Sequence, residues 1–227
     1  MKTIRVDTAH GDASIHLHSG GEERGALVLG HGAGGGVESR DLVATAEAAR
    51  SKGIAVALVE QPYRVAGRRS PAPPRQLDAA WIAAVDHLRA GELRGLPLVV
   101  GGRSLGARVA CRTADATGAV GVLCLAFPLL PPRRRASSRA PESRLAELDA
   151  VTVPTLVVQG ARDRFGMPPP GPQRTVVEVP GDHSLRTDVQ AVADAVRAWL
   201  PGVVERAAAA AKGSAAGARQ EAAEPRD

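Results

Sequence analysis

Aliphatic runs alternate with amphipathic stretches along most of the chain, from about residue 26 to residue 200. The runs that are apolar enough to form buried strands lie at 26–29, 54–59, 98–100, 120–126, 155–158 and 176–179. The stretches between them repeat apolar positions every three to four residues, as amphipathic helices do. These helix candidates lie at 38–51, 76–90, 105–117, 142–149 and 185–200. Alternating strands and helices with short connections predict a mostly parallel sheet covered by helices on both faces.

The first residues follow a different pattern, in which apolar and polar positions alternate. Residues 2–8 and 13–18 show this alternation on either side of His10-Gly11-Asp12. Two such segments joined by a glycine-containing turn predict an antiparallel hairpin, which would begin the sheet.

The C-terminal segment lacks any apolar stripe. We expect the last helix to stop at Pro201, because proline breaks the helical hydrogen-bond pattern. Residues 203–227 are rich in alanine with interspersed charges, and we interpret them as a disordered or marginally helical tail with no role in the fold. The domain is therefore predicted at 1–202. A loop rich in proline, arginine and serine is expected at 131–141.

Composition and charge narrow the classes of protein that remain. The 227 residues fit one domain with a full core. The net charge is +5, but no groove-reading module or aromatic stacking surface accompanies the arginines, so we expect no nucleic-acid partner. No stretch approaches the length of a membrane span, and no leader is visible, so we expect a cytoplasmic protein with no membrane partner. The two cysteines, Cys111 and Cys124, lie in aliphatic surroundings and form no disulfide framework or metal cluster.

The first candidate for chemistry is Ser104, the central residue of a G-x-S-x-G pattern. Gly102 and Gly106 flank it, a strand candidate precedes it and a helix candidate follows it. This context predicts a nucleophile elbow, a tight strand-to-helix turn that exposes the serine hydroxyl at a helix N-terminus. A glycine-rich turn that happens to contain serine is the alternative.

A second glycine-rich loop follows the strand candidate at 26–29 and runs from His31 to Gly36. Such a loop lets backbone N–H groups approach a developing oxyanion, and we assign the two donors to Ala33 and Leu105. A phosphate-cradling loop is the alternative, but neither phosphate-binding signature is present. His31 is expected to brace the loop.

The acid and the base are expected at Asp163 and His183. Each follows one of the last two strand candidates, so both should lie on the same sheet edge as Ser104, in the order Ser, Asp, His. His183 would take the serine proton, and Asp163 would orient the imidazole. Asp182 is the competing carboxylate, poorly placed because it adjoins His183.

These motifs make the chain similar to the α/β-hydrolase superfamily, over residues 26–200. The resemblance is carried by His31-Gly32-Ala33-Gly34, Gln61-Pro62-Tyr63-Arg64, Gly102-Arg103-Ser104-Leu105-Gly106, Gly160-Ala161-Arg162-Asp163 and Gly181-Asp182-His183-Ser184. It is strongest to the small dienelactone-hydrolase-like branch, in the group that includes a testis-expressed protein and a chromatin acetyltransferase complex subunit. It implies a three-layer α/β-hydrolase fold and a serine triad, but no substrate.

Two departures from better-characterised esterases affect the expected site. The segment between about Pro128 and Glu142 is too short for a cap domain, so the site should be open or covered by loops alone. Dienelactone hydrolases proper carry a cysteine nucleophile, whereas this chain has Ser104.

Substrate contacts are expected from Tyr63, Arg64 and Met167. Arg64 lies in a segment with Arg68 and Arg69 that could form a cationic rim for anionic esters, or a solvated loop stiffened by proline. Arg103 should point away from Ser104 and pack against a carboxylate.

Two hypotheses about function follow. The first is a serine hydrolase that cleaves small-molecule carboxylic esters or thioesters through an acyl-enzyme, without metal or cofactor, as a monomer or small homo-oligomer. The second is a non-catalytic binding or scaffold protein that keeps the fold. The intact Ser104, Asp163 and His183 favour the first.

Overall fold

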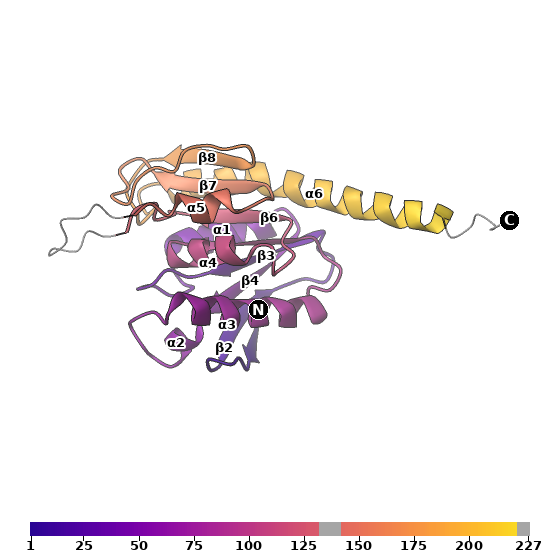
Figure 1. Cartoon of the computed structure of the whole chain (residues 1–227), viewed down its shortest axis with the longest axis horizontal. Coiled ribbons are helices and arrows are strands. Elements are labelled where there is room, and N and C mark those ends of the chain that lie inside the picture. Colours follow the sequence, from indigo (N-terminus) through magenta and orange to yellow (C-terminus); the bar gives the residue numbers. More distant parts are fainter. Residues whose placement is uncertain (132–141, 222–227) are drawn as a thin grey trace.

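A single eight-stranded sheet forms the central layer of the protein, in a computed structural model that describes residues 1–131 and 142–221 (Figure 1). The strands are β1 (Lys2–Val6), β2 (Ala13–His18), β3 (Gly25–Gly30), β4 (Ile54–Glu60), β5 (Leu98–Arg103), β6 (Gly121–Leu125), β7 (Thr155–Gly160) and β8 (Arg174–Val179). Their order across the sheet is β1-β2-β4-β3-β5-β6-β7-β8. β1 and β2 form the expected antiparallel hairpin, and the other six strands are parallel to one another.

Helices cover both faces of this sheet. They are α1 (Arg40–Arg50), α2 (Pro62–Val65), α3 (Pro74–Ala90), α4 (Leu105–Thr113), α5 (Leu145–Asp149) and α6 (Val189–Glu221). One core contains apolar side chains from α3, α4 and α5, including the fully buried Trp81. The other core contains side chains from α1 and α6. The three-layer arrangement predicted from the alternating pattern is thereby confirmed, while the four-residue α2 was not predicted.

Helix α6 differs from the prediction, because it does not end at Pro201. Val203 and Val204 are buried against the starts of two strands. A Cβ added to Gly25 would lie 2.5 Å from Cγ1 of Val204, and one added to Gly121 would lie 2.8 Å from Cγ1 of Val203. Burial of these two valines offsets the hydrogen bond that proline removes from a helix interior.

The predicted tail is therefore helical as far as Glu221, and its first residues belong to the core. The prediction that residues from 203 onward play no role in the fold is wrong. In Figure 1 the yellow end of α6 extends beyond the sheet. Residues 222–227 lie outside the described residues, as does the predicted loop from residue 132 to residue 141.

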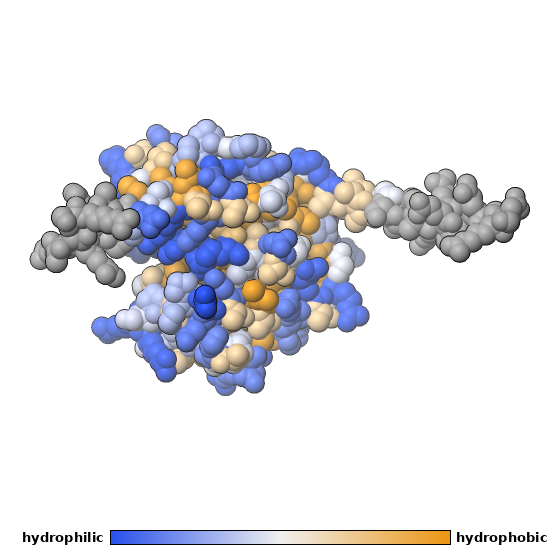
Figure 2. Space-filling view, viewed as in Figure 1, coloured by the Kyte–Doolittle hydropathy of each residue, from blue (hydrophilic) through white to orange (hydrophobic). Residues whose placement is uncertain are grey.

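The surface mixes hydrophilic areas with smaller apolar ones, as Figure 2 shows for one face. In the described part of the chain, the large apolar side chains that remain exposed are Met1, Val43, Leu130 and Met167. No helical cap is inserted within residues 1–131 and 142–221. No described helix is both long and apolar enough to cross a membrane.

Candidate active site

Ser104 occupies the turn between β5 and α4, as the elbow motif predicts. Its backbone angles are φ 52° and ψ −102°, a conformation that residues other than glycine rarely adopt. The Ser104 N–H donates to the carbonyl of Leu125 at 2.9 Å, which ties the turn to the next strand. The flanking glycines allow close packing, since a Cβ on Gly102 would lie 2.5 Å from the Gly30 carbonyl oxygen.

The structure brings Ser104, His183 and Asp163 into one hydrogen-bonded chain. The Nε2 atom of His183 lies 3.0 Å from Oγ of Ser104, and Nδ1 lies 2.8 Å from Oδ2 of Asp163. The Asp163 side chain is only 1% exposed, while that of His183 is 18% exposed. Because they follow β5, β7 and β8, the three residues share the carboxyl edge of the sheet that the sequence predicts.

Asp163 is held in place by two further donors. Nε2 of Gln159 lies 2.9 Å from Oδ2, and the N–H of Phe165 donates to Oδ1 at 2.9 Å. The competing carboxylate, Asp182, instead accepts hydrogen bonds from the Ser184 hydroxyl at 2.6 Å and the Ser184 N–H at 2.9 Å. The Ser184 hydroxyl lowers the pKa of Asp182 below its ordinary value. The geometry therefore favours Asp163 as the partner of the imidazole.

Phe165 also contacts the imidazole directly. Its ring meets that of His183 edge-on, with centroids 4.5 Å apart and planes at 72°. This contact limits rotation of the imidazole in addition to its hydrogen bond with Asp163.

The glycine-rich loop after β3 is braced by His31, as predicted. The N–H of Gln61 donates to Nε2 of His31 at 3.1 Å, so the proton of the neutral ring sits on Nδ1, which lies 2.8 Å from the carbonyl of Gly32. The Tyr63 hydroxyl donates to the carbonyl of Ala33 at 3.0 Å, and burial raises the pKa of Tyr63 to about 12. Two buried side chains therefore fix the loop that carries Ala33.

This bracing predicts that the stability of the fold depends on pH. Burial lowers the pKa of His31 below 6.5, and it outweighs the opposing effects of the Gly32 carbonyl and the Glu60 carboxylate. The unfolded chain therefore binds a proton before the folded one does, and stability is full above about pH 6.5 and falls as the pH drops toward the lowered value. For one such group the slope is at most about 1.4 kcal/mol per pH unit.

Urea unfolding at about pH 7.5 and about pH 5.5 measures this slope. The substitution His31→Asn should make the slope shallower, leaving the part due to His18, whose pKa burial also lowers, whereas His87→Asn, at an exposed position on α3, should leave it as in the wild type. An unchanged slope in His31→Asn would show that another group causes the pH dependence.

The three residues expected to contact the substrate are Tyr63, Arg64 and Met167. Tyr63 is buried and its hydroxyl is committed to Ala33, so its observed contact supports the loop. Arg64 is half-buried beside that loop, and Met167 is 37% exposed on the loop that follows Asp163. The roles assigned to them remain predictions.

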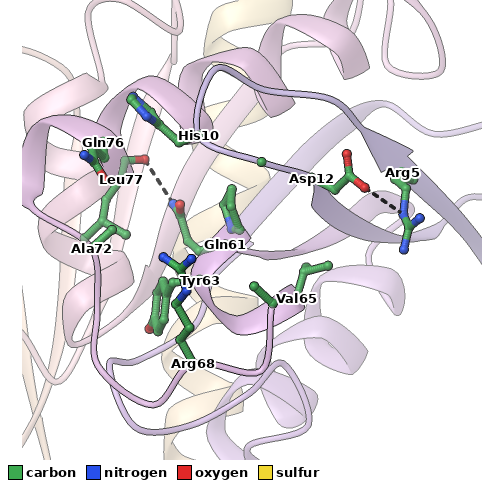
Figure 3. Close-up of a pocket in the computed structure, with 13 residues that line it drawn as sticks. Arg5, His10, Asp12, Gln61, Tyr63, Val65, Arg68, Ala72, Gln76 and Leu77 are labelled. Atoms are coloured by element: carbon green, nitrogen blue, oxygen red, sulfur yellow. Dashed lines mark hydrogen bonds and ion pairs between the residues drawn. The ribbon is translucent and has the colours of Figure 1, made fainter.

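A cavity of about 390 Å³ is lined by Tyr63 and by other residues of the β1–β2 turn, α2, α3 and the segment between α2 and α3 (Figure 3). Arg68 and Gln61 line it together with His10 and Leu77, and Ser104 and His183 do not. Arg68 therefore lines a cavity to which Ser104 and His183 do not contribute.

Three contributors to the site were missed by sequence reasoning. Gln159 is fully buried at the end of an aliphatic strand, and a polar residue at that place is a signal that could have been used. Phe165 carries no signal in the sequence. Asp41 accepts a hydrogen bond from Nε of Arg103 at 3.1 Å, which confirms the carboxylate expected for Arg103. Nothing distinguishes Asp41 from an ordinary acidic residue in a first helical turn.

Among the described residues, no group of three or more His, Cys, Asp or Glu side chains could hold a metal ion. Cys111 and Cys124 are buried free thiols with their sulfur atoms 3.4 Å apart. The hydrogen bond with Cys111, together with burial, raises the pKa of Cys124 well above its ordinary value.

A mostly parallel eight-stranded sheet with a serine elbow and a facing histidine and aspartate defines the α/β-hydrolase class of proteins. The model of the family described as alpha/beta hydrolase domain matches residues 23–199, and the chain belongs to this family. A comparison with curated proteins finds no match.

Solved structures share this fold at low sequence identity. Est1E from Butyrivibrio proteoclasticus is 16% identical with a TM-score of 0.71, covering 90% of this chain and 100% of its own. XC6422 from Xanthomonas campestris, described as a serine hydrolase without lid, is 18% identical with a TM-score of 0.67, covering 90% and 94%. A dienelactone hydrolase from Anabaena variabilis is 17% identical with a TM-score of 0.70, covering 88% and 96%.

Proposed function

We propose that the protein is a serine hydrolase that cleaves carboxylic esters or thioesters of small molecules through an acyl-enzyme intermediate. The observation that carries this proposal is the hydrogen-bonded chain from Ser104 through His183 to Asp163. A hydroxyl, a base and an orienting carboxylate in this geometry are what nucleophilic acyl transfer requires.

The three residues have distinct roles in the proposed reaction, and His183 acts in turn as base and acid. Oγ of Ser104 attacks the substrate carbonyl while its proton passes to Nε2 of His183, and Asp163 stabilises the resulting imidazolium through Nδ1–H. His183 then returns the proton to the departing alcohol or thiol, leaving an acylated Ser104. A water molecule activated by His183 releases the acid and restores the serine hydroxyl.

The developing oxyanion would be bound by the amide N–H groups of Ala33 and Leu105. Neither N–H has a hydrogen-bond acceptor among the described residues. Leu105 begins α4, where the helix N-terminus favours negative charge. A Cβ on Gly32 would meet the Arg103 side chain, so the loop carrying Ala33 lies next to the elbow.

The acyl group of the substrate would meet a partly apolar surface beside Asp163. Leu130 and Met167 are each 37% exposed, and the N–H of Leu130 donates to the Phe165 carbonyl at 2.8 Å. Two exposed apolar side chains next to the Asp163 turn favour an uncharged acyl chain, with Arg64 left to interact with a more polar leaving group.

Labelling with a fluorophosphonate probe, read by intact mass, tests the function. We expect a single adduct on the wild type and none on Ser104→Ala, while Ser19→Ala, at an exposed serine after β2, should label like the wild type. A panel of p-nitrophenyl esters and acyl thioesters would then define the leaving group. If folded wild-type protein forms no adduct, the hydrolase proposal fails and the non-catalytic binding protein becomes the better interpretation.

A further inference from the structure

Arg103, the residue before the serine, joins three segments of the candidate site. Its Nε donates to Oδ2 of Asp41 at 3.1 Å, and its Nη2 donates to the backbone carbonyl of His183 at 3.0 Å. Its Nη1 would lie 2.7 Å from a Cβ on Gly32, so the guanidinium also rests against the glycine-rich loop. One planar side chain therefore contacts the first turn of α1, the loop that carries Ala33 and the loop that carries the histidine.

We propose that Arg103 is a positioning residue that fixes the backbone of His183, and with it the distance from Nε2 to Ser104. This inference rests on the serine-hydrolase function proposed above. A guanidinium suits this task because its donors have a fixed planar arrangement, whereas a lysine offers a single flexible point charge.

The loop around His183 bends on both sides of the histidine. Gly181 and Leu185, two residues to either side, have φ values of 118° and 50°, so the chain passes through left-handed conformations before and after the histidine. The Ser184 hydroxyl donates its hydrogen bond to Asp182, so it does not position the imidazole. Between these two bends, the side chain of Arg103 donates a hydrogen bond to the backbone carbonyl of His183.

The Asp41 carboxylate offsets the positive charge that Arg103 brings close to His183. During the reaction His183 becomes positively charged, and an unpaired guanidinium bonded to its backbone would disfavour that charge. The Asp41 side chain is 1% exposed and the Arg103 side chain is 19% exposed, so their charges offset each other with little screening. The pair therefore positions the His183 backbone while adding little net electric field at the imidazole. Asp163 remains the carboxylate that faces the imidazole.

Four variants separate positioning from a merely structural ion pair: Arg103→Met, Arg103→Lys, Asp41→Asn and the double variant Arg103→Met/Asp41→Asn. The readouts are the rate of fluorophosphonate labelling and the turnover of p-nitrophenyl acetate between about pH 5 and pH 9. Arg112→Met is the matched control, since the Arg112 side chain is also 19% exposed and donates two hydrogen bonds to Asp78, at 2.6 and 2.9 Å, near the C-terminal end of α4. Thermal unfolding of every variant reports whether it is folded.

We expect Arg103→Met to lower the labelling rate and kcat by about 10- to 100-fold with little change in KM, because a small displacement of a catalytic group has effects of this size. Arg103→Lys should recover only part of the loss. The two single variants should shift the midpoint pH of the acid limb in opposite directions. It should rise in Arg103→Met, where the Asp41 carboxylate is left unpaired, and fall in Asp41→Asn, where the guanidinium is left unpaired. The double variant should restore the midpoint but not the rate.

The proposal is overturned if the folded Arg103 variants label as fast as Arg112→Met and their pH profiles coincide with that of the wild type. In that case wild-type labelling still supports the hydrolase function. If the wild type itself is not labelled, the proposed function fails first, and the role of Arg103 falls with it.

Discussion

Asp163→Asn is expected to lower turnover by about 10⁴-fold while the protein stays folded, the size of effect seen when a triad carboxylate becomes an amide. The carboxylate accepts from three donors, since the N–H of Phe165 reaches Oδ1, and Gln159 and His183 reach Oδ2. An asparagine has only one acceptor oxygen, which the Phe165 N–H would retain.

The amide NH₂ introduced by Asp163→Asn would then face Nδ1 of His183. That contact favours the tautomer with the proton on Nε2, which cannot accept the proton of Ser104. The loss should therefore appear in kcat and not in KM, and only a small loss of stability should accompany it.

Turnover of p-nitrophenyl acetate measures this effect, with Asp182→Asn as the control. Asp182 adjoins His183 but bonds to Ser184, so its amide variant should stay within about threefold of the wild type. Equal losses in the two variants would contradict the assignment of Asp163.

Gly106→Ala is expected to lower the free energy of unfolding by about 3 kcal/mol, near the upper end of the cost of overpacking a core. A Cβ at Gly106 would overlap the carbonyl oxygen and carbon of Gly30, which belong to backbone in the centre of the sheet. α4 packs into the core on one face and β3 into the cores on both faces, so neither can shift without disturbing packed side chains. The overlap is with backbone atoms, so it cannot be relieved by a side-chain rotation.

Urea unfolding of Gly106→Ala and Gly34→Ala tests this expectation. Gly34 is exposed, and an added Cβ would have no atom within 4 Å, so its variant should unfold close to the wild type. If both variants unfold alike, the close approach of α4 to β3 is not what requires a glycine at 106.

Residues whose roles depend on local pattern were predictable from the sequence. Aliphatic runs are typical of strands buried on both faces, and β3, buried at every position, illustrates why 26–29 could be recognised. Ser104, Asp163 and His183 could be placed on one edge because each follows a parallel strand, and parallel strands end at the same edge.

The remaining features depend on packing between distant segments. Pro201 is a helix breaker by local rules, but the burial of Val203 and Val204 on the sheet overrides it. The four residues of α2 are too few for a periodic signal. The contact of Arg103 with Asp41 joins positions 62 apart in sequence, and no local pattern pairs them.

If Ser104 is the nucleophile, as proposed, the position of the site across the sheet makes its reactivity depend on a complete fold. Ser104 follows β5, which is enclosed by β3 and β6, whereas Asp163 and His183 follow β7 and β8 at the outer end of the sheet. β8 has a neighbouring strand on one side only, and its middle residues are partly exposed. Strands at the edge of a sheet detach at lower cost than central ones. A molecule in which β7 and β8 have detached would keep the turn at Ser104 but lose Asp163 and His183 from the site, so its serine hydroxyl would have no general base beside it.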